Sequence, residues 1–301
     1  MTDINFELYK VFYYVAKTLS FSDASRQLYI SQSAVSQSVK ALEKKLDQKL
    51  FIRSTKRVKL TPEGEVLFKH VEPAVNLILR GETQIMESGK MNGGQLRIGS
   101  SDTLCRYFLV PYLKAFHEKF PNVHIKVTNG TSGHCVDFLE NSQVDLIVTN
   151  YPNPRLSTVS NIRKVRDFRD IFIANRQQYA HLKDQVLSFE ELLKYPILML
   201  DKNSMTSEFL HGLCQQRHLD LVPEIELSSN DLLIDLARIG LGIAFVPEFC
   251  LPEDDPDLFQ LTTAEAIPSR QIVVGCGDPL SVSEAAKYFI DSLASPPPGS
   301  F

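Results

Sequence analysis

The segment SFSDASRQLYISQSAVSQSVKALEKKL, residues 20–46, contains two amphipathic stretches joined by a short turn. Ser20 and Ser22 can cap a short first helix, because a serine hydroxyl accepts hydrogen bonds from the free N–H groups of a first turn. Ser31 can cap a second helix that starts at Gln32 in the same way. The inner face of this second helix is apolar at the helical spacing, with Val35, Val39, Leu42 and Leu46. The pattern predicts a helix-turn-helix.

The second helix also has a polar outer face near its start. A recognition helix presents its N-terminal residues to base edges in the major groove of DNA. Glutamine can bond bidentately to adenine there, and serine can bond to several base edges. We therefore predict that this region reads DNA through Ser22, Gln32, Ser33, Ser36, Gln37 and Lys40.

A basic, β-prone segment follows the second helix. Residues 49–53 and 58–61 flank a polar turn, which predicts a two-stranded wing. Lysine and arginine side chains on a wing suit DNA phosphates, which supply affinity and position but no sequence information. The candidates for phosphate contact are Arg53, Lys56, Arg57 and Lys59.

Charge is unevenly distributed along the chain. Residues 1–62 hold 11 Lys and Arg against 5 Asp and Glu, a net charge of +6. The whole chain of 301 residues carries −4, so the remainder carries −10. A basic head on an acidic body favours a polyanionic partner, and together with the polar helix it indicates double-stranded DNA.

The N-terminal region resembles the DNA-binding region of LysR-type transcriptional regulators. The resemblance is dense over about residues 6–68 and rests on the motifs FSDASRQL at 21–28, ISQSAVS at 30–36 and LTPEG at 60–64. Ser33 stands where the family usually has proline, and Ser25 where it usually has alanine. Both residues are small, so the expected fold is unchanged, and Ser33 adds a donor at the DNA. The resemblance implies an N-terminal all-α winged helix-turn-helix.

Residues 62–90 are predicted to form a linker helix that begins with Pro62, a residue suited to a first helical position. Its apolar residues alternate spacings of four and three, at Leu67, Val71, Ala74, Ile78 and Ile85. Such a seam pairs two helices, although packing against its own domain would need the same pattern. Pro73 should kink or strain this helix. The resemblance implies a dimer through this helix, often built up to a tetramer.

Strands and helices alternate after a Gly-rich linker at residues 88–94, which predicts an α/β domain with parallel sheets over 91–301. The strand candidates are residues 95–99, 123–128, 144–149, 171–174, 197–200, 224–227, 243–246 and 270–275, and residues 104–120 form one of the predicted helices. The resemblance implies two Rossmann-like subdomains, as in periplasmic binding proteins. We expect the first at about 95–162 and 270–295, the second at about 163–268, and crossings near 161–165 and 267–271. The DNA-binding domain would then be residues 1–61.

Polar residues follow several of the predicted strands. Ligands in open α/β sheets bind beyond the C-terminal strand ends, where helix N-termini present N–H groups. The candidates for effector binding are Ser100, Ser101, Asp102, Thr103, Asn129, Thr131, Thr149, Asn150, Asp201, Asn203, Ser204, Thr206, Val246 and Pro247. These loops suit a carboxylate or a polar metabolite. Asp102 would repel an anion, however, so a neutral or cationic ligand stays open, and helix capping alone would need the same residue types.

The sequence gives no support for catalysis. It has no phosphate-binding glycine motif and no GxSxG elbow, and its His and Cys residues lack metal-ligand spacing. We expect no catalytic residue, metal or cofactor. Five scattered Cys favour free thiols in the cytoplasm, and the family's peroxide-sensing members leave a redox role open for Cys214 and Cys250. No apolar run is long enough for a membrane span, and the start does not read as a secretory signal.

Two functions therefore compete. The first is a ligand-responsive transcriptional regulator, in which a dimer reads a dyad DNA site and a small effector alters the bend and the contacts with RNA polymerase. The second is a metabolite-binding or enzymatic α/β protein with an N-terminal dimerisation arm. A dimerisation arm alone has no reason to carry a charge of +6, so the basic head favours the regulator.

Overall fold

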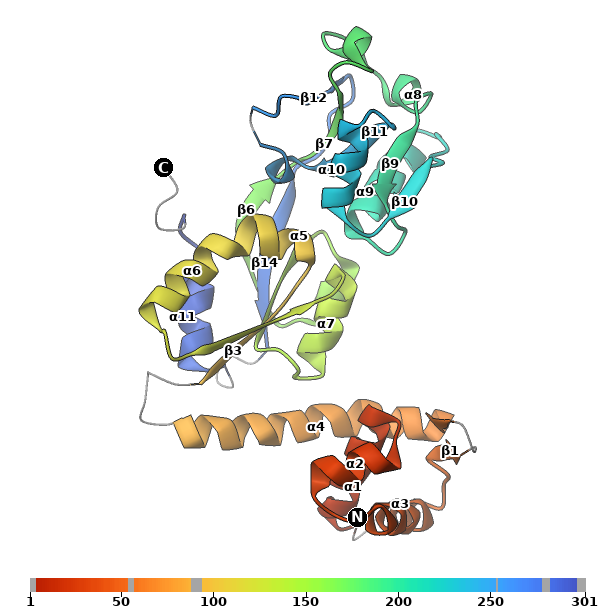
Figure 1. Ribbon diagram of the computed structural model, residues 1–301, viewed down its shortest axis with the longest axis vertical. Coiled ribbons are helices and arrows are strands. Elements are labelled where there is room, and N and C mark those ends of the chain that lie inside the picture. The colour runs from red at the N-terminus through yellow and green to blue at the C-terminus, as the bar shows by residue number, and fades with distance from the viewer. Residues whose placement is uncertain (1–3, 54–56, 88–93, 253, 278–281, 297–301) are drawn as a thin grey trace. The chain divides into compact units, whose positions relative to one another are not determined.

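The computed structural model of the protein describes residues 4–53, 57–87, 94–252, 254–277 and 282–296 (Figure 1). The chain divides into two compact units, one of residues 1–88 with 141–143 and the other of residues 89–140 with 144–301. In the described ranges, no helix has the length and apolar content that a bilayer crossing requires. Lys56 and most of the predicted linker at 88–94 lie outside the described residues.

The first unit contains the predicted helix-turn-helix and wing. In chain order its elements are α1 (Phe6–Thr18), α2 (Phe21–Leu28), α3 (Gln32–Leu46), β1 (Phe51–Arg53), β2 (Val58–Leu60) and α4 (Pro62–Glu87). Ser31 caps α3 by accepting from the backbone N–H of Ala34, as predicted. Ser20 alone caps α2, and Ser22 lies inside the first turn, so the expected capping role of Ser22 is wrong.

Helix α4 continues past Pro73 to Glu87 without interruption. Its apolar seam has two different environments. Val71 is buried in the core of the first unit, which means that the N-terminal half of the helix packs against its own domain. Ile78 and Ile85 are exposed, Ile85 by 75 %. Packing against its own domain is thus confirmed for the N-terminal half, and pairing with a second helix stays a prediction for the exposed half.

The start of α4 is held close to the wing. The hydroxyl of Thr61 donates to the carbonyl of Lys49 at 2.6 Å and accepts from the N–H of Gly64 at 3.0 Å. A Cβ atom on Gly64 would lie 2.2 Å from the carbonyl oxygen of Leu50, so no larger residue fits without backbone movement. The glycine of the LTPEG motif thus sets how closely α4 approaches the wing.

The second unit contains two five-stranded sheets. The first sheet has the order β4-β3-β5-β14-β6, formed by β4 (His124–Asn129), β3 (Gln95–Ser100), β5 (Leu146–Tyr151), β14 (Arg270–Cys276) and β6 (Asn161–Phe168). Figure 1 shows helices on both of its faces. One face packs against α6 (Val110–Lys119) and α11 (Glu284–Ser292), and the other against α7 (Ser132–Glu140).

The second sheet has the order β10-β9-β11-β7-β12, formed by β10 (Ile225–Leu227), β9 (Ile197–Leu200), β11 (Ile243–Pro247), β7 (Asp170–Asn175) and β12 (Leu258–Gln260). A small parallel pair, β8 (Val186–Leu187) and β13 (Thr262–Thr263), lies beside it in the same unit. Helices α8 (Phe189–Leu192) and α9 (Met205–Gln215) cover one face, and α10 (Asn230–Arg238) covers the other. The predicted fold class is confirmed.

Two details of the predicted topology are wrong. Residues 161–168 form a full strand, β6, paired with β14 as far as Phe168 opposite Arg270, so the first crossing lies at Arg169 and not near 161–165. The sheets are also mixed, because β14 runs antiparallel to both of its neighbours and β7 antiparallel to β11. The outer strand β6 is mostly exposed and charged, which hid its strand pattern.

Gly64→Ala should destabilise the first unit, because the new methyl group would meet the backbone of Leu50. We expect a loss of about 3 kcal/mol, the upper end of the usual cost of overpacking. Gly81→Ala, in the same helix, is the matched control, since a Cβ there meets no heavy atom of the described residues within 4 Å. It should gain about 0.5–1 kcal/mol from helix propensity. Urea unfolding of both full-length variants measures the difference, and equal effects would contradict it.

Candidate functional site

The predicted DNA-contacting residues gather on α2, α3 and the wing. Those fully on the surface are Ser22, Gln32, Ser33, Gln37, Lys40, Arg53, Arg57 and Lys59, and Ser36 is partly exposed. Their chemistry combines amide and hydroxyl groups on α3 with cationic groups on the wing. This is the combination that base edges and phosphates require.

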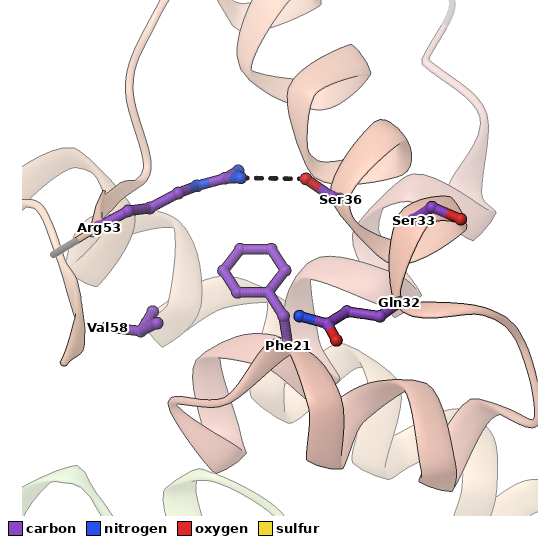
Figure 2. A pocket seen from close by; sticks show the side chains of 6 residues that line it. All are labelled: Phe21, Gln32, Ser33, Ser36, Arg53 and Val58. Carbon is purple, nitrogen blue, oxygen red and sulfur yellow. Dashed lines mark hydrogen bonds between the residues drawn. The ribbon is translucent and has the colours of Figure 1, made fainter. Parts of the chain in front are cut away.

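A hollow lies between α2, the start of α3 and the wing (Figure 2). Its lining combines two apolar side chains with four polar ones: Phe21, Val58, Gln32, Ser33, Ser36 and Arg53. The hydroxyl of Ser33 lies 2.9 Å from that of Ser31, which itself caps α3. The departure from proline at position 33 therefore adds a polar contact to the helix cap.

Arg53 is more constrained than a free phosphate anchor on a wing would be. Its Nη1 donates to Ser36 Oγ at 3.1 Å, and its guanidinium lies 4.4 Å from the centre of the Phe21 ring (Figure 2). Nη2 lies 3.9 Å from a carboxylate oxygen of Glu43. The side chain is nevertheless 35 % exposed.

Glu43 is a structural residue that the sequence reasoning did not single out. Its side chain is 5 % exposed, and Oε1 accepts from the backbone N–H groups of Leu50 at 2.9 Å and Phe51 at 3.4 Å. These contacts tie α3 to the wing. The available signal was an acidic residue next to the inner stripe of α3, a place where burial requires partners.

In the second unit, one edge of each sheet lies where the chain passes from the first sheet to the second. Phe168 ends β6 and Asp170 begins β7, one residue apart. In the first sheet, the C-terminal ends of β3 and β5 lie at the edge where β14 begins. In the second sheet, the C-terminal ends of β9 and β11 lie at the edge where β7 begins. The predicted effector-binding residues follow these strand ends.

Most of these predicted effector-binding residues already have a local partner. Ser101 and Ser204 cap α5 (Asp102–Leu104) and α9, and Ser100 donates to the carbonyl of Val148. The other local bonds are Asn129 to Asp102, His134 N–H to Thr131, and Asn203 N–H to Asp201. Val246 and Pro247 are buried at the end of β11. Capping and turn formation account for the residue type at Ser101, Ser204, Thr131 and Asp201.

Other polar atoms at these edges are buried without a partner in the described part of the chain. They are Thr149 Oγ1, Asn150 Oδ1, Asp170 Oδ1, Asn230 Oδ1, and Nε and Nη2 of Arg270. A buried polar group without a hydrogen bond costs about 1–3 kcal/mol. Sequence reasoning identified Thr149 and Asn150, but not the other three residues.

Arg270 has the largest buried side chain in this set, at 1 % exposed. Nη1 donates to Asp170 at 2.9 Å and to the hydroxyl of Thr206 at 3.1 Å. The guanidinium centre lies 5.3 Å from the ring of Phe168 and 5.0 Å from that of Phe209. Burial raises the pKa of Asp170 above its ordinary value, against the opposing effect of the arginine. This ion pair joins the first residue of β14, in one sheet, to the first residue of β7, in the other.

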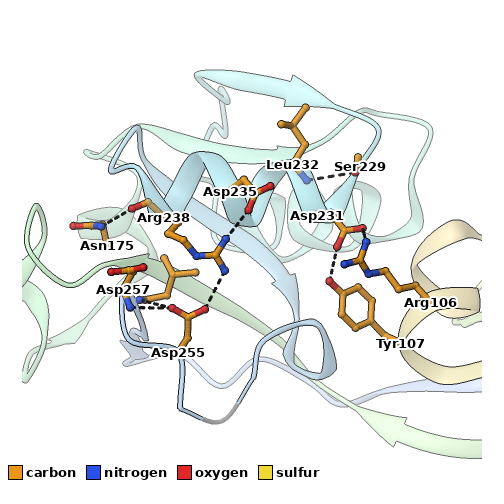
Figure 3. Close-up of polar contacts among 11 residues, drawn as sticks. Arg106, Tyr107, Asn175, Ser229, Asp231, Leu232, Asp235, Arg238, Asp255 and Asp257 are labelled. Carbon is orange, nitrogen blue, oxygen red and sulfur yellow. Dashed lines mark hydrogen bonds and ion pairs between the residues drawn. The ribbon is translucent and has the colours of Figure 1, made fainter. Parts of the chain in front are cut away.

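A second set of contacts connects the sheets through α10 (Figure 3). As Figure 3 shows, the Tyr107 hydroxyl donates to Asp231 at 2.5 Å, and Arg106 pairs with the same carboxylate at 3.3 Å. Outside that view, Asn230 donates to the Thr103 hydroxyl at 2.9 Å. Burial, and then the bond to Asp231, raise the pKa of Tyr107 well above its ordinary value.

Tyr107 lies in a π-helical turn, Cys105–Leu109, between α5 and α6. The helix predicted over residues 104–120 is present, with this π-helical turn in its first half. Such wide turns are frequent at functional sites.

Cys214 and Cys250, for which a redox role was left open, are both buried. Burial raises the pKa of Cys214 and Cys250, which disfavours the reactive thiolate at neutral pH. Within the described ranges, no group of three or more His, Cys, Asp or Glu side chains is arranged to hold a metal ion.

Known families match nearly the whole chain. Residues 6–65 match the bacterial regulatory helix-turn-helix protein family of lysR type, and residues 89–295 match the LysR substrate binding domain. Among curated relatives, a probable RuBisCO transcriptional regulator of Emiliania huxleyi is 28 % identical, over 82 % of this chain and 80 % of its own length. The transcriptional activator CmpR of Synechocystis is 26 % identical, over 83 % and 81 %.

Solved structures share the fold. A single-residue variant of full-length OxyR from Pseudomonas aeruginosa superposes with a TM-score of 0.73 at 17 % identity, covering 97 % of this chain and 95 % of that one. Full-length CbnR complexed with its target DNA gives 0.64 at 17 %, covering 95 % and 100 %. The chain is thus a transcriptional regulator with a helix-turn-helix for DNA and a separate substrate-binding domain. It belongs to the LysR family of bacterial regulatory proteins.

Asp170→Asn should strongly destabilise the second unit, because it leaves Arg270 buried without a counter-charge. We expect a loss of about 3–5 kcal/mol. Adding Arg270→Met should recover much of that loss, since the remaining side chains are then neutral. Asp167→Asn is the matched control, because its ion pair with Lys164 is exposed and contributes little. Urea unfolding measures all three variants, and a double variant less stable than Asp170→Asn would contradict the argument.

Proposed function

We propose that the protein is a ligand-responsive regulator that binds dyad DNA sites as a homodimer and senses a small polar metabolite in its second unit. In this proposal α3 enters the major groove, the wing contacts phosphates, and a second copy covers the exposed half of α4 around Ile78 and Ile85. The protein acts in the cytoplasm by binding rather than by catalysis. The bound effector changes the contacts that the protein makes with RNA polymerase at the promoter.

The exposed polar start of α3 carries the DNA-reading part of the proposal. Gln32, Ser33 and Gln37 are all on the surface of the same helix, whose first turn is capped by Ser31. The adjacent wing carries Lys59, which is exposed, and the whole N-terminal region is basic. Helix polarity and wing charge therefore have the separate roles of base reading and phosphate binding.

The ligand-sensing part of the proposal rests on the buried polar atoms at the two sheet edges that have no hydrogen-bond partner among the described residues. Thr149 and Asn150 lie on β5 of the first sheet, and Arg270 begins the neighbouring strand β14, whereas Asp170 begins β7 of the second sheet and Asn230 begins α10, which covers that sheet. A ligand with both donors and acceptors would satisfy hydrogen-bonding groups that otherwise weaken the fold. We therefore propose a small polar effector at this edge, with Thr103 and Thr206 in contact with the same groups.

Gln32→Ala should reduce discrimination between DNA sequences, because it removes the amide suited to base reading. Lys59→Ala should instead weaken binding to all sequences alike and lower the salt slope by about one unit, as expected for one lost phosphate contact. Competition binding with specific and random duplexes over a salt series measures both effects. Loss of the same size on all sequences for Gln32→Ala would contradict base reading.

Thr149→Val should lower effector affinity without weakening the fold, because the buried hydroxyl of Thr149 lacks a partner and valine has nearly the same shape. We expect about a fivefold loss, the size of one hydrogen bond. Ser100→Ala is the contrasting variant: its hydroxyl already donates to Val148, so stability should fall and affinity should stay. The probe is the compound, from a panel of small carboxylates and polar metabolites, that most raises the melting temperature. Unchanged affinity in Thr149→Val would contradict the site.

A further inference from the structure

Arg53 links the wing to the recognition helix at two points. Ser36 and Glu43 lie seven residues apart on α3, which places them two turns apart on one side of the helix. The guanidinium of Arg53 reaches both, with Nη1 3.1 Å from Ser36 Oγ and Nη2 3.9 Å from Glu43. The Phe21 ring lies beside it at 4.4 Å. Three residues on two helices, α2 and α3, thus fix the position of this one side chain, as Figure 2 shows for Phe21, Ser36 and Arg53.

The bond to Ser36 has a defined direction. A guanidinium has donors only, so the Ser36 oxygen must accept. A free serine hydroxyl rotates to suit either a donor or an acceptor. With one lone pair taken by a cation, the O–H bond of Ser36 turns away from Arg53. Ser36 lines the same hollow as Gln32 and Ser33, and its side chain is partly exposed there.

We propose that Arg53 is a positioning residue that turns Ser36 into a hydrogen-bond donor toward the bases. The inference rests on the proposed reading of DNA by α3. In the major groove, adenine, guanine and thymine each present an acceptor, whereas cytosine presents the donor N4–H2. The protein therefore disfavours cytosine at the one position of each half-site that Ser36 reaches. Arg53 thereby contributes to sequence preference, in addition to any contact with phosphate.

The chemistry separates this role from simple phosphate binding. A phosphate contact changes affinity on all sequences and changes the salt slope. A positioning contact changes the preference at one base and needs the Ser36 hydroxyl. Arg53→Lys keeps the charge but loses the planar group that reaches Ser36, Phe21 and Glu43 together. It should leave the salt slope unchanged while removing the discrimination against cytosine.

The test uses the full-length protein and a random DNA library. Selection with the wild type defines the site, and selection with Ser36→Ala identifies the position whose preference is lost. Affinities are then measured by fluorescence anisotropy on duplexes that differ only at that position, at several salt concentrations. The wild type should disfavour cytosine by about three- to tenfold, as expected for one hydrogen bond. Ser36→Ala and Arg53→Lys should each reduce this to less than about twofold.

Three further variants complete the test. The double variant Ser36→Ala/Arg53→Lys should discriminate no less than Ser36→Ala alone, because both changes remove the same contact. Ser36→Thr should retain the preference, since it keeps the hydroxyl. Lys59→Ala, on the same wing, should keep the preference and lower the salt slope.

Full discrimination against cytosine in Arg53→Lys would overturn the inference, as would a further loss in the double variant. If Ser36→Ala loses no preference at any position, the inference is also wrong. If the wild type itself enriches no sequence, the proposed reading of DNA fails, and the inference fails with it.

Discussion

The ion pair between Arg270 and Asp170 is the contact on which the second unit depends. Arg270 begins β14 in one sheet and Asp170 begins β7 in the other, so a single buried pair connects the points where the chain enters each sheet. A buried pair contributes little net stability, but removing either partner is costly. The pair therefore acts on geometry: it holds the start of β14 beside the start of β7, together with the polar groups around them.

In the first unit, a buried carboxylate and a close backbone approach hold the wing in place. A two-stranded wing of three residues per strand has too little surface to hold itself in place. Glu43 provides acceptors for its backbone, and Gly64 allows α4 to approach it closely. The wing is thus placed by contacts with α3 and α4 rather than by its own pairing, which leaves Arg53 in a fixed position beside α3.

Local patterns were predictable from the sequence, and distant partners were not. Ser31 and the bounds of α3 follow from spacing and capping, which depend on neighbours a few residues away. Strand β6 was missed because an exposed edge strand lacks the apolar pattern of a central one. Arg270, Asp170 and Glu43 were missed because a charged residue is usually exposed. Arg270 and Asp170 are 100 residues apart in sequence, and Glu43 meets Leu50 and Phe51 only because the chain turns back after α3.

The contacts between the two sheets differ in the free energy needed to break them. This difference determines which of them a bound ligand could change. An effector shifts a conformation only by binding two arrangements unequally, with a coupling of about 1–3 kcal/mol in typical cases. Breaking the buried pair of Arg270 would cost more than that. The other bonds between the two sides are less deeply buried than the ion pair: that of Tyr107 to the Asp231 carboxylate contributes about 1.5–3 kcal/mol, and that of Asn230 to Thr103 about 1 kcal/mol. A change that preserves the ion pair and exchanges these outer bonds therefore lies within the range that one small ligand can drive.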